Sequence, residues 1–273
     1  MGISSNILWH QTNAKNAKAI LMSKKLSYNY CEEQFSCENG NMFSACFPMI
    51  SLFNMPLEQL YDYIKEDGKY GNVIIGFKEE WWKRNGFSPV NYCTKEAIFF
   101  KTISSQCYEL LNNPHVKDSF KFLTCAYTKM YENDLRKHNY KLYRFYDERE
   151  FRLVPNLDEL EECKLPFVSK EKKIEGVDAL AGVSFELSDI SIIIVENEEA
   201  IIKCRKTIGD SNVIILTYKQ VIHDILGIDH NIEVNPPIRY DNQMIELDGN
   251  GNLRSNVENH LEELKHKQNL KSW

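Results

Sequence analysis

The sequence has no excess of positive charge, no long apolar run and no basic leader. Its formal net charge is −6, which argues against a broadly basic surface for phosphate binding, so nucleic acid is not an expected partner. The longest apolar stretch, residues 190–195, is far too short to cross a bilayer, and no apolar segment follows a basic one near residue 1. We therefore expect a cytoplasmic protein without a membrane partner.

Common catalytic and metal-binding motifs are also missing. The eight cysteines are scattered, with no C-x-x-C pair and no histidine at zinc-finger spacing, so we expect reduced and mostly buried thiols and no metal site. No P-loop, G-x-G-x-x-G, G-x-S-x-G or H-E-x-x-H motif is present. These absences disfavour the familiar nucleotide triphosphatase, kinase, dehydrogenase and zinc-protease mechanisms.

The composition is that of an ordinary folded protein. With 273 residues, of which 43% are hydrophobic and 26% charged, the chain can bury a substantial core. We expect one α+β domain over residues 1–245 and a charged helical tail over residues 246–273. Two tightly packed lobes are the alternative organisation.

Hydrophobic periodicity indicates short strands interrupted by helices. A turn is expected inside the segment 42–53, at Pro48. Strands are predicted at residues 7–10, 42–53, 70–77, 141–145, 150–154, 187–195 and 213–216. Helices are predicted at residues 13–24, from 56 to about 67, at 78–85, twice between 94 and 138, and through 201–204. The predicted fold is α+β, a twisted mixed sheet with helical insertions.

Three separated residues have the chemistry of a site that cleaves the nicotinamide–ribose bond. Glu150 could stabilise an oxocarbenium-like centre, His10 could bind a ribose hydroxyl, and Tyr70 could stack on nicotinamide. Each also has a structural interpretation: His10 as a core histidine, Tyr70 as one of 14 tyrosines, and Glu150 as one arm of an ion pair. Glu148 is a rival carboxylate, because strand periodicity would place it on the same face as Glu150.

The same segments resemble a known family. The resemblance rests on Trp9-His10-Gln11-Thr12, the run from Tyr70 to Phe77 with the Trp81 helix, the Pro89-Val90 piece, and Tyr146-Asp147-Glu148-Arg149-Glu150-Phe151-Arg152. Over about residues 5–225 the chain resembles the AbiGi family, described as antitoxins of bacterial abortive phage-resistance systems.

The arrangement of a first-strand histidine, a central tyrosine and a late glutamate is also similar to that of ADP-ribosyltransferases. This second resemblance implies an ADP-ribosyltransferase-like fold and NAD as the substrate. It implies that Glu150 and His10 are catalytic and that His10, Thr12 and Tyr70 bind NAD.

The two resemblances predict different functions. The first hypothesis is an anti-phage ADP-ribosyltransferase that depletes NAD or modifies a macromolecular acceptor of ADP-ribose. The alternative is a noncatalytic antitoxin that neutralises a partner toxin by direct binding, and a third is a nucleotide-sensing module. The expected protein partner is a cognate toxin, an antitoxin or another defence protein.

Overall fold

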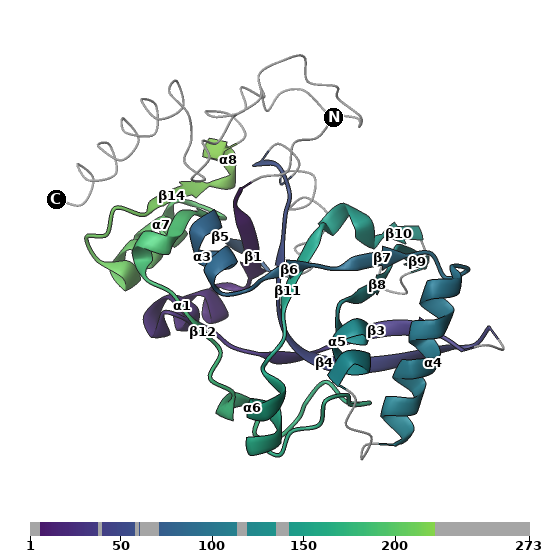
Figure 1. Ribbon diagram of the computed structural model, residues 1–273. Helices are drawn as coiled ribbons and strands as arrows, with labels where there is room; N and C mark the ends of the chain where they lie inside the picture. Colours follow the sequence, from purple (N-terminus) through teal and green to yellow (C-terminus); the bar gives the residue numbers. More distant parts are fainter. Residues whose placement is uncertain are drawn as a thin grey trace. The chain divides into compact units, whose positions relative to one another are not determined.

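Two compact units make up the chain in the computed structural model (Figure 1). The structure describes residues 6–37, 40–57, 60, 71–113, 119–134 and 142–221. Unit 1 is formed by Met1–Lys24, Asn54–Arg84 and Phe185–Trp273, and unit 2 by Lys25–Phe53 and Asn85–Ser184. The predicted boundary at residue 245, the tail helix and Tyr70 lie outside the described residues.

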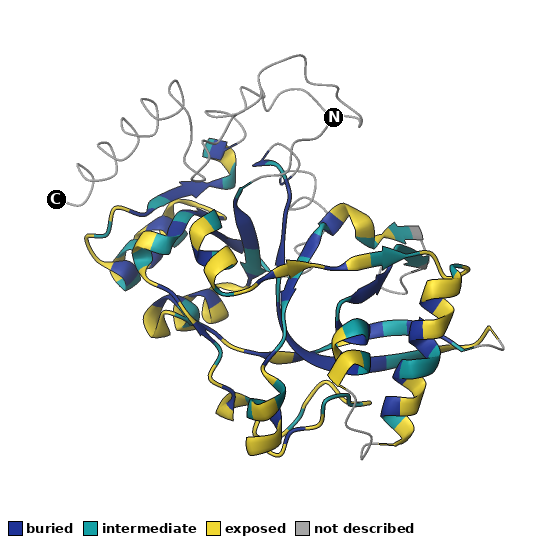
Figure 2. Cartoon of the chain, in the orientation of Figure 1, coloured by how far each residue is buried: buried dark blue, intermediate teal, exposed yellow. Residues whose placement is uncertain are grey.

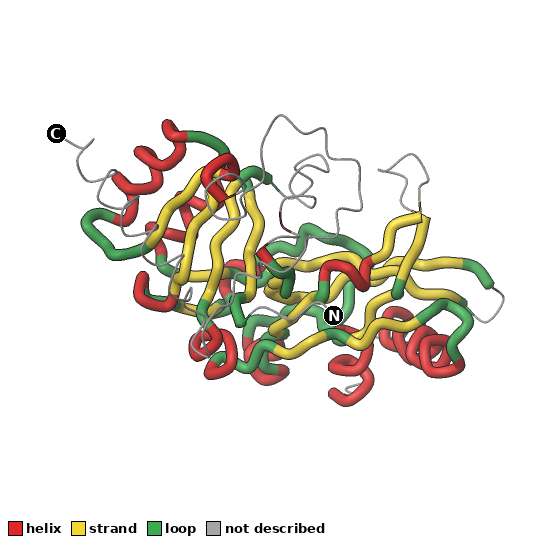
Figure 3. The backbone as a smooth tube through the Cα atoms, turned by 90° about the horizontal axis from the view of Figure 1, so that it is seen from above, coloured by secondary structure: helices red, strands yellow, loops and turns green. Residues whose placement is uncertain are grey.

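Unit 1 contains a mixed layer of strands, which confirms the α+β class with a mixed sheet. Neighbouring strands follow in the order β14 (Ile214–Thr217), β13 (Ile190–Val195), β5 (Val73–Phe77) and β1 (Leu8–Thr12). Strands β13 and β14 are parallel, whereas β5 is antiparallel to both β13 and β1. Figure 3 draws the strands in yellow and the helices in red. The side chains of β5 are all buried, as expected for a central strand with covered faces.

The helices of unit 1 begin at capping residues that the sequence supplies. In α1 (Ala14–Ser23) the side chain of Asn13 accepts a hydrogen bond from the Asn16 amide, so Asn13 rather than Thr12 is the N-cap. Asn197 caps α7 (Glu198–Ile208) in the same way. The remaining helical elements are α3 (Glu79–Arg84), η4 (Leu187–Asp189) and α8 (Tyr218–Gln220).

Unit 2 is built on a long hairpin of β3 (Asn29–Ser36) and β4 (Met42–Phe53). Strand β11 (Glu150–Leu153) pairs with the end of β4, and β6 (Ser88–Pro89) pairs with β11. The turn predicted at Pro48 is wrong, because β4 continues through this residue, opposite Tyr30. Proline tolerates extended backbone, and residues 45–50 of β4 are all buried. Figure 2 colours the chain by burial, and much of β4 is dark blue there.

Short strands and helices complete unit 2. Aromatic contacts join helices to the hairpin: Phe100 stacks on Phe35, Phe122 packs against Phe47, and Tyr108 meets Phe43 edge-on. The strands are β2 (Lys25–Leu26), β7 (Asn91–Cys93), β8 (Thr128–Met130), β9 (Glu132–Asp134), β10 (Leu142–Arg144) and β12 (Val183–Ser184). The helical elements are α4 (Ile98–Asn112), α5 (Ser119–Ala126), η2 (Phe145–Glu148), α6 (Leu157–Glu162) and η3 (Val177–Ala179).

The second helix predicted between residues 94 and 138 is shorter than expected. Helix α5 ends at Ala126, and the chain then forms β8, which pairs in parallel with β7. All three residues of β8 are buried, including Lys129, whose ammonium group needs carboxylate partners in unit 2. Tertiary pairing therefore overrides the helical periodicity of this segment.

All eight cysteines are free thiols, as the scattered spacing predicts. Four of them are buried, and the other four are partly exposed. The buried ones are Cys46, Cys107, Cys125 and Cys204.

Candidate functional site: a buried charge network in unit 2

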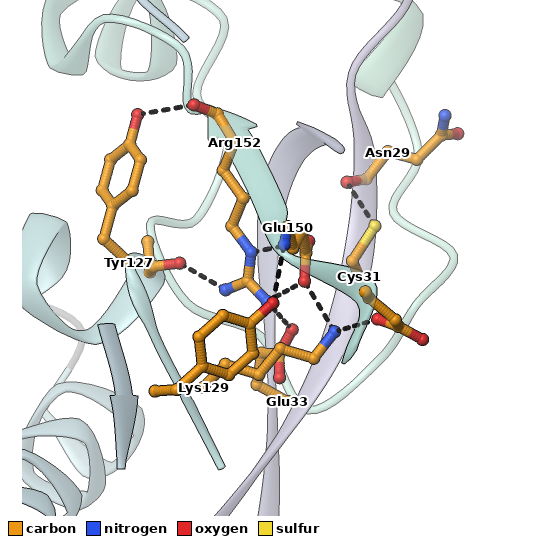
Figure 4. A network of polar contacts seen from close by, with 10 residues as sticks. Asn29, Cys31, Glu33, Tyr127, Lys129, Glu150 and Arg152 are labelled. Carbon is orange, nitrogen blue, oxygen red and sulfur yellow. Dashed lines mark hydrogen bonds and ion pairs between the residues drawn. The ribbon is translucent and has the colours of Figure 1, made fainter. Parts of the chain in front are cut away.

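Five charged side chains meet inside unit 2, and we call this group the buried charge network (Figure 4). Charged side chains are almost never this buried unless they are paired. The members are Glu33 on β3, Lys129 on β8, Glu148 on η2, and Glu150 and Arg152 on β11.

Arg152 is the centre of the network and has no solvent exposure. Its Nε lies 2.7 Å from Glu150 Oε1 and its Nη2 lies 2.9 Å from Glu150 Oε2, so the guanidinium binds the carboxylate with two parallel hydrogen bonds. Nη2 also donates to Glu33 Oε1, and Nη1 donates to the carbonyl of Ala126 at 2.5 Å. One side chain thus joins β11, β3 and the end of α5.

Lys129 joins the two carboxylates that flank Arg149. Its Nζ lies 2.6 Å from Glu150 Oε2 and 3.0 Å from Glu148 Oε2, and it sits 5.0 Å from the centre of the Phe145 ring. The hydroxyl of Tyr143 donates to Glu148 Oε1 at 2.8 Å. Both oxygens of Glu150 and both oxygens of Glu148 therefore accept hydrogen bonds from within unit 2.

Burial and charge act in opposite directions on these groups. Burial alone would raise the pKa of Glu150, but Arg152 and Lys129 outweigh it and hold that pKa well below the ordinary 4.5. Burial would lower the pKa of Lys129, but Glu150, Glu33 and Glu148 raise it well above 10.5. For Glu33 burial wins, and its pKa is raised despite Arg152.

Glu148 and Glu150 both lie beside Lys129, but not because they alternate along one strand. The predicted strand at residues 141–145 stops at Arg144, and residues 145–148 form the 3₁₀ turn η2. Arg149 then adopts a left-handed conformation with φ 44° before β11 begins. Because of this turn the two carboxylates converge on Lys129. Which of them is the functional carboxylate stays a prediction.

The predicted site residues lie in different units. Glu150 is a member of the buried charge network in unit 2. His10 is partly exposed on β1, opposite Ile75, and Thr12 is buried at the end of the same strand, both in unit 1. Tyr70 lies outside the described residues. The convergence of His10, Thr12, Tyr70 and Glu150 on NAD stays a prediction.

Sequence reasoning missed three members of the network. Glu33 lies on β3, which no sequence pattern predicts. The periodicity around Lys129 predicts a helix, whereas the residue lies on β8. From the sequence, Arg152 is notable only as a neighbour of Glu150. Glu33 and Arg152 are 119 positions apart in the sequence. The one local indication is the dense run of charges from Asp147 to Arg152, which begins between two predicted strands and continues into the second.

Within the part of the chain that the structure describes, no group of three or more His, Cys, Asp or Glu side chains is arranged to hold a metal ion. Over the same residues, no helix has both the length and the apolar character needed to cross a membrane.

Comparison with known proteins identifies a defence-related family. A family model described as "Putative abortive phage resistance protein AbiGi, antitoxin" matches residues 23–196, which is more than half of the 273 residues. The chain belongs to the AbiGi family. The match includes all of unit 2 and its buried charge network, whereas His10 and Thr12 lie before its first residue.

Further comparisons gave no relatives. No curated protein and no solved structure matches the chain. The family match supports the predicted AbiGi resemblance, and these comparisons give no support for an ADP-ribosyltransferase fold or for NAD.

Removal of Arg152 is expected to be severely destabilising. Arg152→Leu leaves the buried carboxylate of Glu150 without its two-bond partner, and such losses cost about 3–5 kcal/mol. Arg144→Ala breaks an exposed ion pair with Asp147, with N···O 2.8 Å, and should cost less than about 1 kcal/mol. Urea unfolding of the two variants measures this difference, and equal losses would contradict the central role of Arg152.

Acid should remove the contribution of Glu150 to stability. Because the folded pKa of Glu150 is depressed, its stabilising effect is complete above the unfolded pKa, ordinarily 4.5, and is lost as the pH falls below it. The difference in unfolding free energy between wild type and Glu150→Gln should therefore shrink between about pH 7 and about pH 3. A difference that stays constant over this range, measured by urea unfolding at each pH, would contradict the assignment.

Proposed function

We propose that this protein is the antitoxin of an anti-phage abortive-infection system and that it neutralises a cognate toxin by binding it directly. Membership of the AbiGi family carries the proposal. The family match contains the whole of unit 2, so the proposal assigns toxin binding to that unit.

The charge of the chain favours protein binding over operator binding. A repressor-type antitoxin needs a basic surface that neutralises DNA phosphates. This chain instead carries a formal net charge of −6. Direct contact with the toxin is therefore the mechanism that the composition supports best.

The surroundings of Glu150 favour a noncatalytic role over NAD-dependent ADP-ribosyl transfer. A catalytic glutamate must present its carboxylate to the ribose, but both oxygens of Glu150 are bound by Arg152 and Lys129 and the residue is only 6% exposed. This arrangement is typical of a structural carboxylate. ADP-ribosyl transfer, with Glu150 and His10 as catalytic residues and NAD as substrate, stays the second hypothesis.

Co-expression tests the antitoxin proposal. Cells that express the product of the gene neighbouring the gene for this chain should stop growing, and wild-type chain should restore growth and co-purify with that product. A frameshifted copy, which gives the transcript without the protein, is the control and should not restore growth. Rescue by the frameshifted copy, or rescue without a complex on gel filtration, would rule out neutralisation by direct binding.

Nicotinamide release tests the enzymatic hypothesis. We expect purified wild-type protein and Glu150→Gln to release no nicotinamide from NAD, with or without cell lysate as a source of acceptors, because the Glu150 carboxylate is bound within the network. Release by wild type that Glu150→Gln abolishes would instead establish an NAD-consuming enzyme. Both proteins must first show the same folded signal by circular dichroism.

A further inference from the structure

Three tyrosines of unit 2, Tyr92, Tyr131 and Tyr146, form a cluster that we call the tyrosine face. The ring of Tyr146 stacks on that of Tyr131, with centroids 5.2 Å apart and planes at 26°. It meets the ring of Tyr92 edge-on at 5.3 Å. Tyr146 nevertheless stays 47% exposed, so an ordered aromatic ring is presented to the outside of unit 2.

The backbone beneath the tyrosine face is fixed. The Tyr146 amide donates to the carbonyl of Tyr131 at 3.2 Å, and the Arg149 amide donates to the carbonyl of Tyr146 at 3.1 Å. Tyr92 Oη accepts the Glu150 amide at 2.6 Å, which ties the second ring to the start of β11. The rings are therefore held in place before any partner arrives, which lowers the entropic cost of binding.

The buried charge network anchors this turn from within. Glu148, the last residue of η2, binds Lys129, and Glu150 binds both Lys129 and Arg152. A buried ion network gives little net stability compared with well-packed apolar side chains. Its contacts with Glu148 and Glu150 fix the geometry of residues 145–150, the segment that carries the exposed ring of Tyr146.

The charge around the tyrosine face indicates the chemistry of its partner. Arg144 is paired with Asp147 at 2.8 Å, whereas Arg149, partly exposed, has no ion pair among the residues that the structure describes. Among the exposed and partly exposed charged side chains of residues 144–149, Arg144 and Asp147 cancel, so Arg149 adds one positive charge to the surface of a chain whose formal charge is −6. An acidic surface on a partner is attracted by Arg149, whereas the net negative charge of the chain as a whole repels it.

We propose that the tyrosine face, with Arg149 beside it, is the surface that docks the toxin, and that the toxin contributes an apolar pocket for Tyr146 with carboxylates at its rim. Tyrosine and arginine are the residues most enriched among binding hot spots, especially where they are rigid and central. The inference rests on the proposed antitoxin function and adds the contact surface and the chemistry of the partner.

Matched tyrosine variants test the proposal on the full chain. The probe is the purified neighbouring-gene product, titrated by calorimetry at two salt concentrations. Tyr146→Ala should weaken binding by at least about 30-fold, as expected for a hot-spot aromatic. Tyr108→Ala is the control, because Tyr108 is 53% exposed on α4 of the same unit and meets one ring, Phe43, edge-on. This control should bind within about twofold of wild type.

Charge variants test the acidic rim independently of the aromatic ring. Arg149→Glu should weaken binding by about 10-fold at low salt and less at high salt, because screening reduces attraction and repulsion alike. Lys101→Glu, at an exposed position of α4, makes the same change of charge elsewhere and should have little effect. Should Tyr146→Ala fail to fold by circular dichroism, Arg149→Glu decides the question.

The outcomes separate the two proposals. Wild-type protein that neither binds the probe nor restores growth overturns the proposed function and this inference together. Wild type that binds while Tyr146→Ala and Arg149→Glu bind equally well leaves the antitoxin function intact and overturns the docking surface. Equal losses from Tyr146→Ala and Tyr108→Ala would also overturn it.

Discussion

The two-bond pairing of Arg152 with Glu150 is the interaction on which unit 2 depends. Neither group could be buried alone, because the free energy lost on desolvating an isolated charge is far larger than the free energy gained from a single hydrogen bond. Once the pair forms, the remaining donors of Arg152 reach Glu33 and the carbonyl of Ala126, and the remaining oxygen contact of Glu150 reaches Lys129. These contacts therefore form only when four elements are in their native positions: strands β3, β8 and β11 and the end of α5.

The sequence predicts those helices and strands in which the spacing of apolar residues reflects which side chains are buried. Strands β5 and β13 are apolar runs bounded by polar residues, and α1 and α7 begin at asparagine caps, so each could be located from neighbouring residues alone. Strand β3 escaped prediction because Glu33 interrupts its apolar pattern, and Glu33 is buried only because Arg152 lies beside it. Lys129 could not be placed for the same reason. Partners that are remote in sequence leave no local periodicity.

Glu150 shows how one residue supports two interpretations until its surroundings are seen. In the sequence, Glu150 lies in a charged run that follows Phe145 and Tyr146. This position is equally typical of a catalytic carboxylate and of a carboxylate in a structural ion pair. The structure provides Arg152 and Lys129 as its direct partners, and the family match includes Glu150 but begins after His10 and Thr12. The residues that suggested NAD thus divide between the region that defines the family and a segment that precedes it.

The short strand β6 has a consequence for how unit 2 can meet other chains. It comes last in the order of its sheet, has only two residues, and one of them is Pro89, which faces Phe151. Proline offers no amide hydrogen, so this border cannot present the row of donors that an incoming strand requires. A partner cannot extend the sheet here by backbone pairing and must use side-chain contacts instead. Copies of this chain likewise cannot join to one another through this border by backbone pairing.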